Sequence, residues 1–256
     1  MGDIINIWKQ IGETPLQATE RARKEYRIGP TPSCFTGRLD PMAQGTMVAL
    51  FGDAIKFQDE YNSCDKTYRF HAILGISTDT YDPMGSIIDI QDISKDQVSR
   101  FNTEMLKMAG RITQPFPPYS AYRYKGHPLW WHARRGTLPT PMPCKERVIY
   151  SVSEIKGERG ERDVAPPVCM SVSKYRKTAI SDMRDVIFYN EDKFNCTEYI
   201  REWLRLDSTL SVWRAQYEIT VSSGTYIRSI VHNLGQRLGI PAHAARITRI
   251  GQRLHS

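Results

Sequence analysis

One aspartate stands in a turn-rich segment where its carboxylate would be held out for chemistry. Asp40 follows Gly37 and precedes Pro41 in residues 36–45, which read TGRLDPMAQG. A carboxylate presented on such a loop, rather than packed inside a helix or strand, suits a nucleophile or a base. The alternative is an ordinary turn aspartate that accepts a hydrogen bond from its own backbone beside the proline.

Arg228 is the second residue whose position needs a chemical explanation. Apolar residues after Gly224, among them Ile227, Ile230 and Leu234, recur at a spacing that predicts a helix. Arg228 would lie in the first turn of that helix, where the positive end of the helix dipole disfavours a cation. A nearby carboxylate would compensate. The alternative is an arginine in solvent.

Six motifs, collinear along the chain, carry a family resemblance. They are residues 5–12 (INIWKQIG), 36–45 (TGRLDPMAQG), 52–57 (GDAIKF) with 65–68 (DKTY), 78–85 (TDTYDPMG), 117–126 (PPYSAYRYKG) and 223–230 (SGTYIRSI). Together they resemble the TruB family of pseudouridine synthases, over nearly the whole chain except about residues 157–210. The resemblance implies a pseudouridine synthase fold, with a central mixed, mostly antiparallel sheet flanked by helices and loops.

The resemblance also implies a reaction, the isomerisation of uridine to pseudouridine with no cofactor and no metal. The N-glycosidic bond breaks, the uracil turns in its pocket, and C5 is rejoined to C1′. The sequence leaves open whether the aspartate adds to the sugar or assists deprotonation at C2′. A target base inside a structured loop would have to be flipped out and received by stacking groups.

Roles follow residue by residue from the resemblance. Asp40, Tyr68 and Arg228 are the expected catalytic residues, with Arg228 paired to Asp40 and Tyr68 stacked on the base. The expected substrate-binding residues are Tyr226, Phe35, Lys9, Lys56, Arg123 and Lys125. From the residues alone, Tyr68 is also readable as a core aromatic, and Lys9 and Lys56 as solvated lysines.

The chain departs from the family pattern in three places. Phe35 stands where the family has a histidine that enters the space vacated by the flipped base; phenylalanine can stack there but cannot form a hydrogen bond. We expect no C-terminal PUA-type RNA-binding domain, although the family usually has one. We therefore expect one catalytic domain over residues 1–256, with an insertion or subdomain at residues 157–210.

Hydrophobic periodicity gives the elements that must position these residues. It predicts strands at residues 4–8, 46–51, 67–74, 146–155 and 213–221. It predicts helices from a capping box at Thr14 to about Tyr26, from a second capping box at Ser94 to Gly110, at residues 129–135 and 197–206, and after Gly224. Strands and helices alternate irregularly, which predicts an α+β fold.

Composition narrows the class of protein further. With 40% hydrophobic and 25% charged residues among 256, the chain should fold as one main domain with an appendage. Its apolar runs are too short for a membrane span or a secretory signal. Five cysteines at irregular spacings predict free thiols and no zinc site. We expect an intracellular, reducing location, the cytoplasm first and an organelle matrix as the alternative.

The positive charge predicts a polyanionic partner. The net charge is +7, and acids are missing from residues 105–145, which hold seven basic residues, and from residues 224–256, which hold five arginines. RNA phosphates would explain this pattern, and two solvated basic faces are the alternative. The expected partner is a tRNA T-loop stem-loop, with rRNA as a second candidate. We expect a monomer unless the chain works within a ribonucleoprotein particle.

Two function classes compete with an active synthase. The first is an RNA-binding or ribosome-assembly protein on the same fold, with its catalytic activity lost or dispensable. Asp40, Tyr68, Tyr226 and Arg228 together favour the enzyme, because a binding module does not need them. The second is a carboxylate-pair glycosidase, which fits poorly because no second acid stands in a comparable loop.

Overall fold

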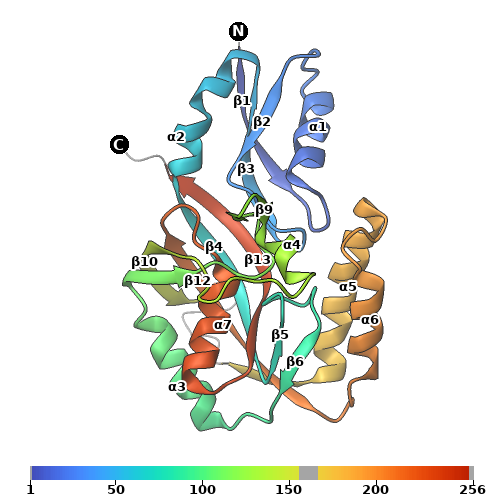
Figure 1. Cartoon of the computed structure of the whole chain (residues 1–256), viewed down its shortest axis with the longest axis vertical. Coiled ribbons are helices and arrows are strands. Elements are labelled where there is room, and N and C mark those ends of the chain that lie inside the picture. The colour runs from blue at the N-terminus through green and yellow to red at the C-terminus, as the bar shows by residue number, and fades with distance from the viewer. Residues whose placement is uncertain (1, 156–166, 254–256) are drawn as a thin grey trace.

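A nine-stranded sheet organises the residues that the structure, a computed structural model, describes, namely 2–155 and 167–253 (Figure 1). Its main order is β1-β3-β13-β4-β12-β10-β7, with β2 beside β3 and β11 beside β12. All neighbours are antiparallel except β3 and β13, which are parallel. The strands are β1 (Asp3–Lys9), β2 (Ser33–Thr36), β3 (Gln44–Phe51), β4 (Asp65–Leu74), β7 (Gly110–Pro115), β10 (Cys144–Glu154), β11 (Val168–Ser171), β12 (Ser211–Val221) and β13 (Ala242–Arg253). The predicted α+β fold with a mixed, mostly antiparallel sheet is confirmed.

Helices cover both faces of this sheet. They are α1 (Pro15–Glu25), α2 (Gln58–Ser63), α3 (Lys95–Leu106), α4 (Leu129–Ala133), α5 (Val172–Asn190), α6 (Cys196–Arg205) and α7 (Ile227–Leu238), with a 3-10 helix at Gly52–Phe57. Side chains alternate along β4, so Phe70 packs in one core with Phe101 of α3 and Ile230 of α7. Ile73 faces the opposite way and joins a second core with Trp203 of α6. No helix in the described ranges has the length and apolar character to cross a membrane.

Both predicted capping boxes are confirmed. The Thr14 hydroxyl accepts a hydrogen bond from Gln17 N, and the Gln17 side chain accepts one from Thr14 N. Ser94 and Gln97 repeat the arrangement at the start of α3. These reciprocal bonds satisfy backbone donors that a helix otherwise leaves unpaired.

The region predicted as an insertion holds more helix than expected. Its residues 157–166 lie outside the described residues, but α5 runs for 19 residues where only mixed charges were noted. Val172, Tyr175, Ala179, Met183 and Val186 recur every three or four residues and are buried. The helical pattern was present but diluted by the charges between these positions. Together α5 and α6 form a helical hairpin (Figure 1).

β13 was not predicted as a strand at all. It lies between β3 and β4 and pairs with β4 over most of its length. Two register shifts interrupt the pairing, and Arg246, at the first of them, has a φ of 49°. Alanines, arginines and bulges hide the period-2 pattern that identifies a strand.

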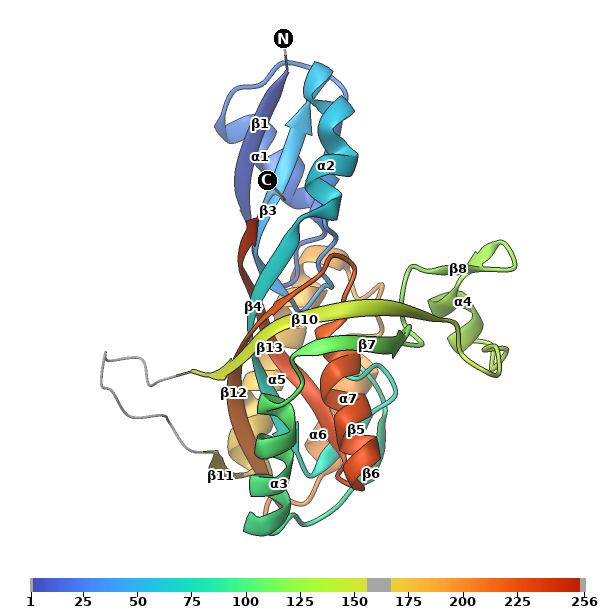
Figure 2. The same ribbon diagram turned by 90° about the vertical axis from the view of Figure 1, so that its left-hand side faces the viewer.

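A projecting loop, residues 119–143, extends from the sheet between β7 and β10 (Figure 2). It contains α4 and the short strands β8 (Arg123–Tyr124) and β9 (His127–Pro128). The buried His132 ring bonds Thr137 Oγ1 through Nδ1 at 3.0 Å and the Tyr124 carbonyl through Nε2 at 3.0 Å. The loop therefore has its own small polar core.

Candidate active site

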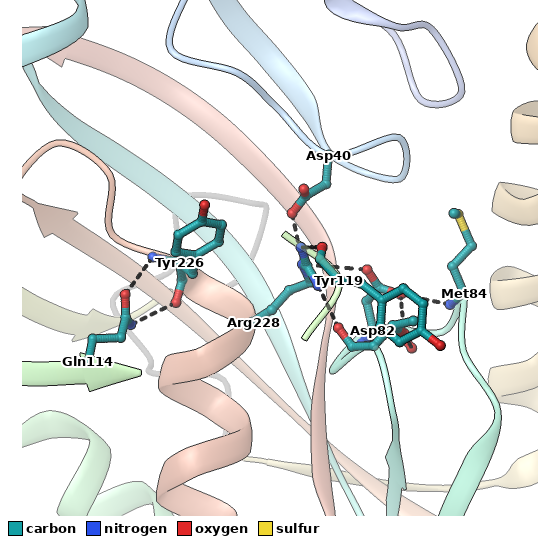
Figure 3. Close-up of polar contacts among 8 residues, drawn as sticks. Asp40, Asp82, Met84, Gln114, Tyr119, Tyr226 and Arg228 are labelled. Carbon is teal, nitrogen blue, oxygen red and sulfur yellow. Dashed lines mark hydrogen bonds and ion pairs between the residues drawn. The ribbon is translucent and has the colours of Figure 1, made fainter. Parts of the chain in front are cut away.

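Asp40 and Arg228 meet although 188 residues separate them. Asp40 lies on the loop between β2 and β3, and Arg228 lies in the first turn of α7 (Figure 3). Arg228 Nε donates to Asp40 Oδ2 at 2.8 Å. Its other nitrogens donate to the carbonyls of Thr80 and Tyr119, and the side chain is 3% exposed. The guanidinium is thus fixed from several directions with one edge on the carboxylate.

Asp82 is a second carboxylate on the same guanidinium, and the sequence analysis gave it no role. Its Oδ2 lies 3.6 Å from Arg228 Nε, while its Oδ1 accepts hydrogen bonds from Thr80 Oγ1 and Met84 N, both at 2.8 Å (Figure 3). Burial raises the pKa of Asp82 to about 6, although Arg228 opposes the rise. Burial alone would lower the pKa of Arg228, but Asp40 and Asp82 together raise it. Arg228 therefore stays charged between two acids.

A cavity of about 310 Å³ lies on one side of Asp40, between two tyrosines. Tyr68 reaches it from β4, and Tyr226 reaches it from the residue before α7. Gln114 of β7 fixes Tyr226, since its side chain accepts from Tyr226 N at 2.9 Å and donates to Tyr226 O at 3.0 Å (Figure 3). Burial raises the pKa of Tyr226, so the phenol keeps its proton at neutral pH. The structure therefore brings together Asp40, Tyr68, Tyr226 and Arg228, as expected.

Two buried cations line the same cavity, and sequence reasoning missed both. Lys66 is 3% exposed and donates to the Asn62 carbonyl at 2.7 Å; Arg249 is 1% exposed and donates to the carbonyls of Thr46 and Gly37. In the described ranges neither is within ion-pair distance of an acid. Burial, helped by Arg249, lowers the pKa of Lys66 to about 8. This side of the cavity is therefore electropositive.

Lys9 corrects the sequence analysis. It is 0% exposed, so the prediction of an RNA contact is wrong, and so is the alternative of a solvated lysine. Its ammonium donates to the carbonyls of Ala43 at 2.6 Å, Gln10 at 3.0 Å and Pro41 at 3.3 Å. Burial lowers the pKa of Lys9 to about 8. Lys9 holds the loop that carries Asp40, because the loop folds its carbonyls over the end of β1.

Phe35 and Lys56 lie away from the cavity of Tyr68. Phe35, on β2, packs against the main core and lines a second cavity on the other side of Asp40. Lys56 is exposed on the 3-10 helix, with its ammonium 5.1 Å from the centre of the Phe57 ring. Their roles toward RNA stay predictions.

The first acid-free stretch includes the exposed basic surface of the projecting loop. Four of its cations, which we call the loop cations, are exposed: Arg123, Lys125, Arg134 and Arg135. Three lie over rings of the same loop, with Arg135 4.0 Å from the centre of Trp131. Cations interleaved with aromatic rings suit a nucleic-acid backbone and its bases. That Arg123 and Lys125 bind substrate stays a prediction.

The second acid-free stretch is not a basic surface. Arg228 and Arg249 are buried inside the site. Arg246 pairs with Asp182 at 3.0 Å, and Arg237 approaches Glu104 at 3.6 Å. Acids that are distant in sequence pair with Arg228, Arg237 and Arg246, while backbone carbonyls surround Arg249. A local count of charges cannot show this.

The family model described as "TruB family pseudouridylate synthase (N terminal domain)" matches residues 26–173, more than half of the chain and including the Asp40 loop, Tyr68 and Asp82. The chain belongs to the TruB family. Its relatives named "tRNA pseudouridine synthase B" include one from Burkholderia pseudomallei (strain 668), 27% identical over 248 residues. Another, from Tolumonas auensis, is 28% identical over 248 residues.

These TruB relatives are longer than this chain. The alignments cover 97% of the chain and 63% of the Burkholderia protein, and 96% of the chain and 58% of the Tolumonas protein. The chain thus spans about three-fifths of the length of the relatives it matches.

Solved structures share the TruB fold with this chain. A chain in the "Crystal Structure of a Cbf5-Nop10-Gar1 Complex" matches with a TM-score of 0.54 and 16% identity, covering 97% of this chain and 48% of that one. A chain in the archaeal box H/ACA sRNP Nop10-Cbf5 complex gives a TM-score of 0.51 at 15% identity, over 97% and 47% of the two chains.

Proposed function

We propose that this protein is an RNA pseudouridine synthase that isomerises a uridine in the T loop of tRNA. The observation that carries the proposal is the Asp40–Arg228 ion pair at the edge of a cavity walled by Tyr68 and Tyr226. The tRNA substrate is supported by the names of the relatives, and rRNA is the second candidate.

Asp40 would act on the sugar of the target nucleotide. The N1–C1′ bond breaks, with its electron pair leaving on the uracil, and Asp40 either adds to C1′ or removes a proton from C2′. The uracil turns and C5 bonds to C1′, while Asp40 either leaves C1′ or returns its proton to C2′. The C5 proton is then lost and N1 gains one, so the product is an isomer. Arg228 keeps Asp40 ionised and aligned during these steps.

Lys66 and Arg249 would serve the uracil while it carries negative charge. Both line the cavity that holds Tyr68, and both are cations without an acidic partner in the part of the chain that the structure describes. Fixed positive charge in a site shielded from water stabilises an anion without reorganisation. Tyr68 would stack on the flipped base, a contact worth about 1–3 kcal/mol.

Asp40→Asn tests the proposal. The substitution removes the charge but barely changes the volume, so we expect pseudouridine formation on a T-loop stem-loop to fall at least about a thousandfold, in line with the loss of a catalytic group. RNA affinity should stay within a few-fold of wild type. Asp59→Asn, at an exposed position on α2, is the matched control.

Wild-type-like turnover by purified Asp40→Asn would contradict the assignment. Pseudouridine mapping of total RNA, with and without the protein, identifies the substrate. If the wild-type protein binds RNA but no position depends on it, the chain is instead an RNA-binding or assembly protein on this fold.

A further inference from the structure

A second cavity lies on the other side of Asp40, and the proposed function gives no role to the residues that form one of its walls. This cavity, of about 570 Å³, shares Asp40 with the cavity of Tyr68. One wall comes from the α5–α6 hairpin, through Phe194 of the turn and Tyr199 of α6. Trp130 of the projecting loop lines it as well. Its volume is in the range of small-molecule sites, and it continues directly from the catalytic carboxylate.

The chemistry of this cavity fits a nucleotide. Phe194, Tyr199 and Trp130 each leave part of a ring accessible, as a stacking platform requires. Three exposed cations also line it: Arg38, Arg134 and Lys193.

The acids that line this cavity are already occupied. Arg228 is shared by Asp40 and Asp82, and Arg21 pairs with Glu13 at 2.7 Å, so at most one of these acidic charges is left against the three exposed cations. The charge left over is positive, so phosphate is the group that would be attracted.

Hydrogen bonds and close packing fix the α5–α6 hairpin to the rest of the protein. Asn190, which is buried, donates to the Gly12 carbonyl at 2.7 Å. Gly12 lies on the loop between β1 and α1 and has a φ of 86°. A Cβ at this position would lie 2.4 Å from the Asp185 carbonyl oxygen, so α5 approaches the β1–α1 loop closely. Trp203 of α6 donates to the carbonyl of Pro83, next to Asp82, at 3.0 Å. The hairpin is therefore tied to the loops on both sides of the site.

We propose that this cavity binds a second unpaired nucleotide of the RNA, one that flanks the target uridine, and that the α5–α6 hairpin supplies its stacking surface. The inference rests on the proposed function and extends it to substrate choice. The base packs on Phe194 and Tyr199 opposite Trp130, and its phosphate faces the cationic rim. The flanking nucleotide thereby positions the uridine at Asp40.

The kinetic test pairs a protein change with an RNA change. Phe194→Leu keeps an apolar side chain but removes the ring, and a stem-loop with an abasic residue on the 5′ or 3′ side of the uridine removes the base. We expect one abasic position to lower kcat/KM of the wild type by about 5- to 150-fold. Phe194→Leu should lower kcat/KM on the intact RNA and have little further effect on that abasic RNA.

Phe188→Leu is the matched control, because Phe188 lies on the same hairpin, is 82% exposed and does not line the cavity. It should leave kcat/KM unchanged on every RNA. The inference is overturned if neither abasic position matters, or if Phe194→Leu loses the same factor on intact and abasic RNAs.

A binding measurement separates this inference from the proposed function. With 2-aminopurine at the flanking position, stacking in the cavity should quench the fluorescence in wild type and in Phe188→Leu, but much less in Phe194→Leu. Quenching without turnover would contradict the synthase and support the subsite. Turnover with the same fluorescence in all three proteins would contradict the subsite alone.

Discussion

Replacing Arg228 with methionine measures how strongly the buried guanidinium holds its two carboxylates. The substitution leaves Asp82 buried, with its hydrogen bonds from Thr80 and Met84 but without a cation. Removing one partner of a buried ion pair costs about 3–5 kcal/mol. We expect the free energy of unfolding at neutral pH to fall by that amount. Turnover should also fall strongly, because Asp40 loses its donor at 2.8 Å.

The loss of stability should depend on pH, because Asp82 titrates. Burial raises its pKa from 3.8 to about 6 in the folded protein, so between these values the folded state binds more protons than the unfolded chain. The free energy of unfolding therefore decreases as the pH rises through this window, by about 3 kcal/mol in total. Without Arg228 the pKa of Asp82 rises further and the window extends upward. The deficit of Arg228→Met relative to wild type should thus be larger at about pH 7.5 than at about pH 5.5.

Urea unfolding followed by tryptophan fluorescence at both pH values measures this deficit. The double variant Arg228→Met/Asp82→Asn should recover most of the stability at neutral pH but none of the turnover, since Asp40 still lacks its partner. Arg237→Met, which removes an exposed cation from the same helix, should change the stability by less than about 1 kcal/mol. The reasoning is refuted if the deficit is equal at both pH values, or if Asp82→Asn gives no recovery.

Three further sets of substitutions test the roles of the buried and exposed cations. Lys9→Met should lower turnover at least about tenfold by loosening the Asp40 loop. It should leave the salt dependence of RNA binding unchanged, and a changed salt slope would restore Lys9 as an RNA contact. Burial lowers the pKa of Lys9 from 10.5 to about 8, so between these pH values the folded protein binds fewer protons than the unfolded chain. Urea titrations should therefore show that the wild type gains stability relative to Lys9→Met as the pH rises from about 8 to 10.5. Lys66→Met should lower kcat at least about tenfold with little change in RNA affinity, and a loss confined to affinity would place Lys66 on phosphate instead. Changing all four loop cations to alanine should reduce the salt slope of binding by about 0.7–0.9 for each phosphate that the loop no longer neutralises, with kcat at saturation nearly unchanged; an unchanged slope would remove the projecting loop from the RNA.

The sequence motifs predicted that Asp40 and Arg228 form an ion pair, because the need of Arg228 for an acidic partner can be inferred from the sequence alone. A cation in the first turn of a helix needs an acid, and the family resemblance indicated which one. Asp82 lies in one of the six motifs, residues 78–85, but the sequence analysis gave it no role. Its meaning depends on sharing Arg228 at 3.6 Å, which only the folded chain reveals.

The sequence did not predict which charged residues and which strand are buried. From the sequence, Lys9 and Arg249 would be expected on the surface because they are charged. In the structure, both donate hydrogen bonds to backbone carbonyls of distant segments. The same limit applies to β13, whose alanines and arginines are acceptable in a strand only because β3 and β4 enclose it. In α5 the pattern was readable, and counting its apolar positions would have found it.

The central place of β13 determines when the site can exist during synthesis. Residues 3–51, which carry Asp40, join the main sheet through β13, a strand that begins only at residue 242. A chain leaving the ribosome therefore cannot complete the sheet until almost all of these 256 residues have been translated. Pairing across so long a separation is slow, and a product truncated before residue 242 would lack both the strand and Arg249. The proposed site can then form only after residue 242 has been translated, and chains that end before it should be inactive.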